Sequence, residues 1–121
     1  MSDQQELQPQ FLSSSTLIGD PVTNSAGEDL GKIEEIMVDL ENGQIAYAVL
    51  SFGGFLGIKN KLFVIPWGML VVDTKNEKII LDVDKEALEN APGFDKDNWP
   101  TKPTRDWLET VYVYYEFPRY W

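Results

Sequence analysis

The chain has 121 residues, 43% of them hydrophobic and 25% charged, and it contains neither cysteine nor histidine. A chain of this length forms one modest domain that can bury a core without disulfides or a structural metal. The missing cysteines exclude disulfide frameworks, zinc ribbons and thiol nucleophiles, and the missing histidines exclude the Ser-His-Asp relay and imidazole metal ligands. What remains favours a binding module over an enzyme.

Charge narrows the class of partner. Twenty acidic residues against ten basic ones give a net charge of −10, which repels phosphate backbones and anionic lipid headgroups. No apolar run reaches the roughly 18 residues of a membrane span, and the N-terminus has no signal-peptide pattern. We therefore expect a cytoplasmic protein with no nucleic-acid partner and no membrane insertion.

Residues 1–15 (MSDQQELQPQFLSSS) have no sustained periodicity and are rich in glutamine and serine. This composition predicts a disordered N-terminal tail. We place the folded domain at residues 16–100 and a separate aromatic C-terminal segment at residues 101–121.

Hydrophobic residues alternate with a period of two from residue 17 to residue 83, which is typical of strands. In the clearest run, Ile36, Val38 and Leu40 are expected to form the buried face, and they alternate with Glu35, Met37 and Asp39. Asn42 and Gly43 suit a tight hairpin turn, and Pro66 predicts a bend before the next strand. Six strands are predicted, at residues 21–23, 31–40, 44–52, 62–67, 69–73 and 79–83. Six short, mostly antiparallel strands favour a small barrel, because closure removes exposed edges.

Two helices are predicted after the last strand. Asp84 is a good N-cap for a short helix over DKEALENA, which Pro92 and Gly93 end. The final segment alternates like a strand in VYVYYEF, yet Thr104 can cap a helix over residues 105–116, and we favour the helix. Its predicted apolar stripe contains Trp107, Val111 and Tyr114 or Tyr115, widened by Leu108 and Tyr112.

The first candidate partner-binding element is a glycine-rich loop that contains Phe55, Leu56 and Ile58 and ends at Lys61. It lacks the sequence motif of a phosphate-binding loop, and no helix is predicted directly after it. The favoured role is a corner that plugs the barrel end. If its apolar side chains are exposed, the loop and its lysines form a contact for an acidic partner.

The second candidate is the C-terminal segment, in which seven of the last eighteen residues are aromatic. One helix face cannot hold all of them, and tyrosine and tryptophan concentrate at interface hot spots. We favour a protein contact, with self-association into a homodimer or larger assembly, over docking of the segment on its own barrel. The residues predicted to make this contact are Trp107, Val111, Tyr112, Tyr114 and Tyr115.

No catalytic, cofactor or metal site is predicted. Asp95, Asp97 and Asn98 resemble a calcium loop but lack its glycine and its final glutamate, so a solvated turn is favoured. Two alternatives stay open. One is a regulator that binds a small ligand or ion at the barrel mouth or at residues 95–98. The other is a carboxylate hydrolase, which needs two acids facing one cleft.

The sequence resembles PRC-barrel domain proteins over residues 16–100. The resemblance rests on LIGDPVTNSAGEDLGKIEEIMVDLENGQIAYAVLSFGGFLGIKNKLFVIPWGMLVVD, then IILDVDKEAL, then NAPGFDKDNWP. It implies a compact six-stranded barrel like those of the photosynthetic reaction-centre H subunit and of a ribosome maturation factor. Those relatives use the barrel for protein docking, so the resemblance implies a docking role here and leaves the partner unnamed.

Overall fold

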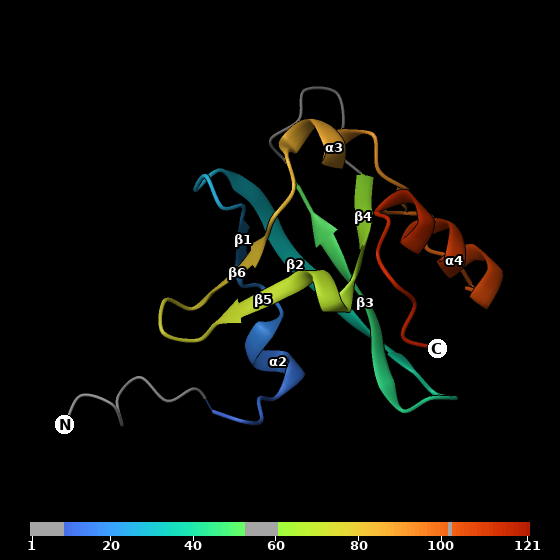
Figure 1. Cartoon of the computed structure of the whole chain (residues 1–121), viewed down its shortest axis with the longest axis horizontal. Coiled ribbons are helices and arrows are strands. Elements are labelled where there is room, and N and C mark those ends of the chain that lie inside the picture. Colours follow the sequence, from blue (N-terminus) through green and yellow to red (C-terminus); the bar gives the residue numbers. More distant parts are fainter. Residues whose placement is uncertain (1–8, 53–60, 102) are drawn as a thin grey trace.

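The computed structural model describes residues 9–52, 61–101 and 103–121. Its main element is one sheet of seven strands in the order β5-β6-β1-β2-β3-β4-β7 (Figure 1). Neighbouring strands are antiparallel except β1 and β6, which are parallel. The strands are β1 (Pro21–Thr23), β2 (Asp29–Asp39), β3 (Gln44–Ser51), β4 (Lys61–Pro66), β5 (Leu70–Asp73), β6 (Lys78–Leu81) and β7 (Gly93–Asp95).

The predicted fold class, mainly β, is confirmed, and all six predicted strands are present. The seventh strand, β7, lies in a segment for which the sequence predicted a polar loop. Three residues are too few to show a period of two. Only their pairing with β4 identifies them as a strand. In the described part of the chain no pairing joins the end strands β5 and β7, so the sheet is open where closure was predicted.

The helices agree with the predictions in place and type. α3 (Lys85–Glu89) follows β6, although the N-cap residue Asp84 makes no side-chain capping bond. α4 (Arg105–Tyr114) begins at Thr104, whose side-chain oxygen accepts a hydrogen bond from the Trp107 N–H. One turn of 3-10 helix, η1 (Trp67–Met69), makes the predicted bend after β4. A further helix, α2 (Ser14–Leu17), includes residue 15, where the disordered tail was predicted to end.

Two apolar cores lie on opposite faces of β3 and β4. The first core joins strands that are not neighbours in the sheet, because Ile79 and Leu81 of β6 share it with Phe63 and Ile65 of β4. The sheet therefore curls around this core. The second core lies on the outer face, where Val49 and Val64 are covered by α4 and the C-terminal segment. As the unbroken apolar run of β3 predicted, this strand is buried on both faces.

The β2–β3 hairpin extends beyond the rest of the sheet (Figure 1). β1 pairs with β2 only as far as Lys32, whereas β3 follows β2 to Asp39. The predicted hairpin turn is confirmed, with Gly43 at a φ of +66°. The burial predicted along β2 is wrong at its end: Val38 and Leu40 are 59% and 94% exposed, and Asp39 is buried. Here the hairpin has passed the first core, so the described part of the chain leaves the face that carries Val38 largely exposed, while α4 covers the face that carries Asp39.

Candidate functional site

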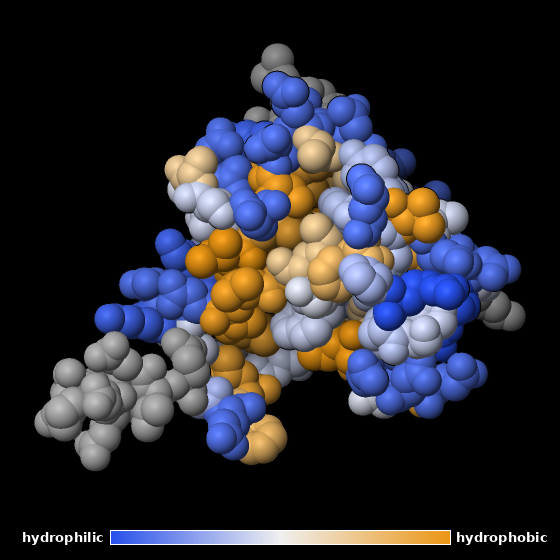
Figure 2. Space-filling model, viewed as in Figure 1, coloured by the Kyte–Doolittle hydropathy of each residue, from blue (hydrophilic) through white to orange (hydrophobic). Residues whose placement is uncertain are grey.

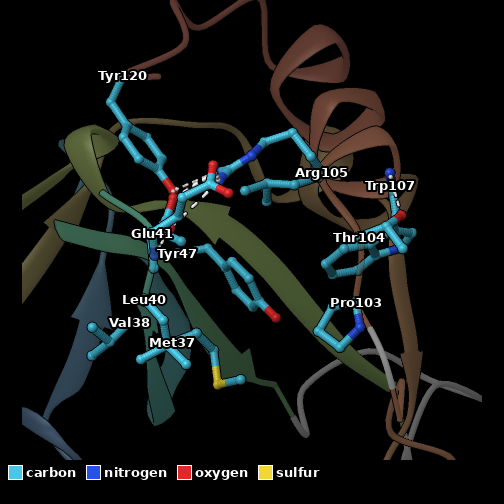
Figure 3. Close-up of a pocket in the computed structure, with 13 residues that line it drawn as sticks. Met37, Val38, Leu40, Glu41, Tyr47, Pro103, Thr104, Arg105, Trp107 and Tyr120 are labelled. Carbon is cyan, nitrogen blue, oxygen red and sulfur yellow. Dashed lines mark hydrogen bonds and ion pairs between the residues drawn. The ribbon is translucent and has the colours of Figure 1, made fainter. Parts of the chain in front are cut away.

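A groove of about 620 Å³ lies between the projecting hairpin and the start of α4. We call it the hairpin–helix groove. Figure 3 shows Tyr47 pointing from the hairpin toward Pro103, while Val38 points away from Pro103 and Thr104. Its lining residues come from β2 and its turn, from β3, from the start of α4 and from the chain end: Met37, Val38, Asp39, Leu40, Glu41, Ala46, Tyr47, Pro103, Thr104, Arg105, Trp107, Leu108 and Tyr120.

A buried carboxylate, Asp39, ties the hairpin to α4 and to the C-terminal segment. Arg105 Nη1 donates to Asp39 Oδ2 at 2.6 Å, and the Tyr120 hydroxyl donates to the same oxygen at 2.5 Å (Figure 3). The backbone N–H groups of Glu41 and Asn42 donate to Oδ1, and the Asn42 side-chain amide donates to Oδ2. Arg105 also reaches Glu41 Oε1 at 3.2 Å. These contacts fix the two walls of the groove relative to each other.

The contacts of Asp39 also settle the charges in the groove at neutral pH. The hydrogen bonds from Arg105, then from Tyr120, hold the pKa of the Asp39 carboxyl well below its usual range. The bond to Asp39 is in turn the largest cause that raises the pKa of Arg105. Burial, followed by the bond to Asp39, raises the pKa of Tyr120 to about 12. The cluster is therefore an ionised carboxylate, a guanidinium and a neutral phenol.

The five predicted contact residues of the C-terminal segment divide into buried and partly exposed side chains. Val111 and Tyr112 lie in the second core, where the Tyr112 hydroxyl donates to the carbonyl oxygen of Ala46 at 2.7 Å. Trp107 is half-buried and meets the Tyr47 ring edge-on, with 5.6 Å between ring centroids. The apolar stripe of the helix therefore packs against the chain's own sheet.

The remaining two residues of that set are adjacent tyrosines with different surroundings. Tyr115 is half-buried against both cores, and it rather than Tyr114 completes the predicted stripe. Its burial raises the pKa of its hydroxyl, which has no hydrogen-bond partner among the described residues. Tyr114 is 38% exposed and donates to the carbonyl oxygen of Ala87 at 2.6 Å. Contact of either with a partner stays a prediction.

The glycine-rich loop is not part of this site. Phe55, Leu56 and Ile58 lie outside the described residues. The lysine that ends the loop, Lys61, opens β4 and pairs with Asp95 of β7. The other predicted element that bears on ligands, residues 95–98, is an exposed turn in which the Asn98 N–H donates to the Asp95 carbonyl oxygen. Within residues 9–52, 61–101 and 103–121, no group of acidic side chains is arranged to hold a metal ion.

Sequence reasoning did not single out Asp39 and Arg105, whose side chains meet across 66 residues. Asp39 followed the strand alternation as an outward residue, and Arg105 was only the first residue of a helix. One signal was available: an aspartate three residues before Asn42 can bond the backbone of a hairpin turn, as it does here. The long-range partner depends on how the last helix packs, which no local pattern determines.

The described residues contain no helix that is both long enough and apolar enough to cross a membrane.

Comparison with known proteins identifies the family. No match was found among curated proteins. Among solved structures, the chain is similar to a putative 16S ribosomal RNA processing protein, RimM, from Pseudomonas aeruginosa, with 17% identity and a TM-score of 0.46. The match covers 68% of this chain and 49% of that one, so this chain spans about half the length of that protein. The family model described as PRC-barrel domain matches residues 9–88, well over half of the sequence, and the chain therefore belongs to the PRC-barrel family.

Proposed function

We propose that this chain is a non-catalytic protein-interaction module that docks a segment of another protein at the projecting hairpin and the hairpin–helix groove. The observation that carries the proposal is the exposure of Val38 and Leu40, 59% and 94%, on a hairpin that extends past the first core. These side chains contribute to no core cluster. Neighbouring exposed apolar residues on a soluble protein are typical of an interaction surface.

The wall of the groove has the composition of an interface. Tyr47 and Trp107 are in edge-on contact at the groove, and aromatic side chains of this kind supply much of the energy of protein interfaces. The hydrogen bonds and ion pairs of Asp39 hold both walls in place before a partner arrives. A preformed surface loses less conformational entropy on binding, which favours affinity.

The chemistry of the groove supports binding over catalysis. Its one buried carboxylate, Asp39, is held ionised by six hydrogen-bond donors, with a pKa far below neutral. A general acid or base works best with a pKa near the working pH and with a free hydrogen-bonding position for the substrate. Asp39 meets neither condition, so we assign it to the architecture of the groove.

The charge of the chain favours a basic partner. Glu41 has a side chain that is 84% exposed at the groove, and Arg105, the only cation among the described lining residues, is already paired with two carboxylates. The chain as a whole has a net charge of −10. Two copies of such a chain repel each other, whereas a positively charged segment is attracted. We therefore favour a separate basic protein as the occupant over the self-association that the aromatic segment suggested.

The experiment selects ligands without assuming a sequence. A random 12-residue peptide library displayed on phage is selected on the immobilised full chain, and synthetic copies of the selected peptides are titrated calorimetrically. We expect these peptides to bind the wild type and to bind Leu40→Asp and Val38→Asp at least about tenfold more weakly, as interface anchors do. Val71→Asp is the matched control, because Val71 is 60% exposed on the distant strand β5.

Three outcomes would contradict the proposal or its occupant. If no peptide is selected, or if Val71→Asp weakens binding as much as Leu40→Asp, the hairpin is not the docking surface. Sedimentation equilibrium of the full chain tests the second copy as occupant. A monomer at all concentrations agrees with the proposal. If the chain is a dimer and Leu40→Asp dissociates it, the surface serves self-association and not the binding of a separate protein.

A further inference from the structure

One edge of β2 has no partner strand over its second half. Within the described residues, β1 pairs with β2 up to Lys32, and no other strand continues along that side to Asp39 (Figure 1). The N–H of Ile36 donates at 3.1 Å to the side-chain Oε1 of the preceding Glu35 instead of to a neighbouring strand. A backbone donor that is satisfied only by an adjacent side chain is free to exchange that partner for a carbonyl of another strand.

The two faces beside this edge differ in chemistry. Ile36 and Val38 lie on one face with the exposed Leu40 beyond them, and Ile36 reaches the first core while Val38 does not. The opposite face carries Glu35, and Glu34 occupies an irregular position in the pairing with β3. From residue 33 to residue 44 the sequence has four acidic residues and no basic one. Asp39 and Glu41 are paired with Arg105, so Glu34 and Glu35 provide the negative charge for an added strand, which would meet an apolar face on one side and these two carboxylates on the other.

We propose that the free edge of β2, from Glu34 to Asp39, accepts an extended segment of a partner protein as an additional strand, in which apolar and basic residues alternate. This inference rests on the proposed function, and it adds the mode of binding and the pattern of the ligand. Main-chain hydrogen bonds to the β2 edge provide affinity, and alternate side chains provide specificity. The apolar residues extend the face of Ile36 and Val38, and the basic residues lie beside Glu35.

Charge explains why a second copy of the same strand is a poor occupant. Antiparallel pairing of this edge with the same edge of another chain would set Glu34 opposite Asp39, and like charges across a strand pair are destabilising. Acidic residues at an edge are a common protection against such association. The same residues attract a basic strand.

The test uses nine-residue peptides with blocked ends in which arginine alternates with valine. Binding to the full-length chain is followed by calorimetry and by NMR of the backbone amides. One analogue carries N-methyl groups on its even-numbered residues and a second carries them on its odd-numbered residues. Because only every other amide of an added strand faces its neighbour, one analogue should lose binding at least about tenfold and the other should retain it. The Ile36 amide should exchange more slowly with solvent when the parent peptide is bound.

A charge variant tests the acidic face. Glu34→Gln with Glu35→Gln keeps a side-chain oxygen for the Ile36 N–H but removes two charges, and it should weaken the peptide by about two- to fivefold per lost pair at low salt. Glu86→Gln with Glu89→Gln, which removes two charges from the exposed face of α3, is the control and should change affinity much less.

The results separate this inference from the proposed function. If both N-methylated analogues bind equally well, or if neither does, strand addition is wrong. If the parent peptide fails to bind while library-selected peptides bind in a Leu40-dependent manner, the docking surface stands and the β2 edge is not its mode of binding. If no peptide of either kind binds, both proposals fail.

Discussion

Arg105 and Asp39 join the first turn of the last helix to the end of β2 through a 2.6 Å ion pair. The Asp39 side chain is 5% exposed and the Arg105 side chain 33% exposed, so the pair is only partly screened by solvent. Glu109 and Arg119 form a second ion pair within the C-terminal region at 3.0 Å, with both side chains about half exposed. The two pairs permit a matched comparison.

We expect Arg105→Leu to lower the unfolding free energy clearly more than Arg119→Leu does, because it leaves the buried Asp39 carboxylate without its cation. Arg119→Leu should cost less than about 1 kcal/mol of unfolding free energy, as exposed ion pairs do. Urea unfolding of both variants at pH 7 gives the comparison. Equal effects of the two substitutions would show that Asp39 does not depend on Arg105.

Asp39 should contribute to the loss of unfolding free energy at acidic pH. The pKa of its carboxyl is lowered in the folded protein, mainly by Arg105 and then by Tyr120, relative to about 3.9 in an unfolded chain. A lowered folded-state pKa contributes stability above the unfolded-state value and loses it as the pH falls toward the folded-state value. We expect Asp39→Asn to be less stable than the wild type at pH 6. The difference should shrink as the pH falls below about 4, as measured by urea unfolding at each pH, and a difference independent of pH would contradict the assignment.

The alternation in the sequence predicted the strands correctly because a half-buried strand must repeat every two residues. It grouped Ile36, Val38 and Leu40 on one face, and it erred in burying all three and in exposing Asp39. The error has a simple physical origin: alternation says which residues share a face but not how far the rest of the sheet extends beneath it. The exposed hairpin end is therefore visible only in the three-dimensional arrangement.

The C-terminal segment shows the same limit. Its helix and its apolar stripe followed from the spacing of Leu108, Val111 and Tyr112, all of which are buried. The sequence did not indicate which surface the stripe contacts. An interface with a partner and a second core on the chain's own sheet require the same residue types. The unbroken apolar run of β3 indicated that something covers its outer face, and α4 is what covers it.

Tyr112 illustrates the consequence for mutagenesis. Removal of its hydroxyl in Tyr112→Phe leaves the Ala46 carbonyl oxygen without that donor and should cost about 1–2 kcal/mol. Tyr112→Ala also opens a cavity in the second core and should cost about 3–5 kcal/mol. Chemical unfolding measures both. A Tyr112→Ala variant as stable as the wild type would contradict the packing of α4 on the sheet.

Leu40 and Leu30 test the division between surface and core within the same hairpin strand and its turn. Leu40 is 94% exposed and Leu30 is fully buried. Leu40→Ser should therefore change the unfolding free energy by no more than about 0.5 kcal/mol, whereas Leu30→Ala should lower it by about 2–5 kcal/mol. A large cost at Leu40 would mean that the side chain is covered in the free protein and is not available to a partner.

At Gly31 of β2, the backbone of β3 occupies the place that a side chain would take. The φ of Gly31 is +113°, and a Cβ atom there would collide with the carbonyl oxygen of Ser51. Gly27 has a similar φ of +83° but open space around the position of a Cβ. Gly27→Ala should therefore cost about 1–2 kcal/mol, which is the penalty of the left-handed conformation alone.

Gly31→Ala should cost at least about 3 kcal/mol, because it adds a collision between two strands to the same conformational penalty. Circular dichroism and urea unfolding of the two variants give the measurement. The collision at Gly31 is with the backbone of Ser51, so removing the Ser51 side chain should not restore stability. The double variant Gly31→Ala with Ser51→Ala should therefore be as unstable as Gly31→Ala. Equal costs at Gly27 and Gly31 would show that β2 and β3 separate at this point, which would also loosen the base of the projecting hairpin on which partner binding depends.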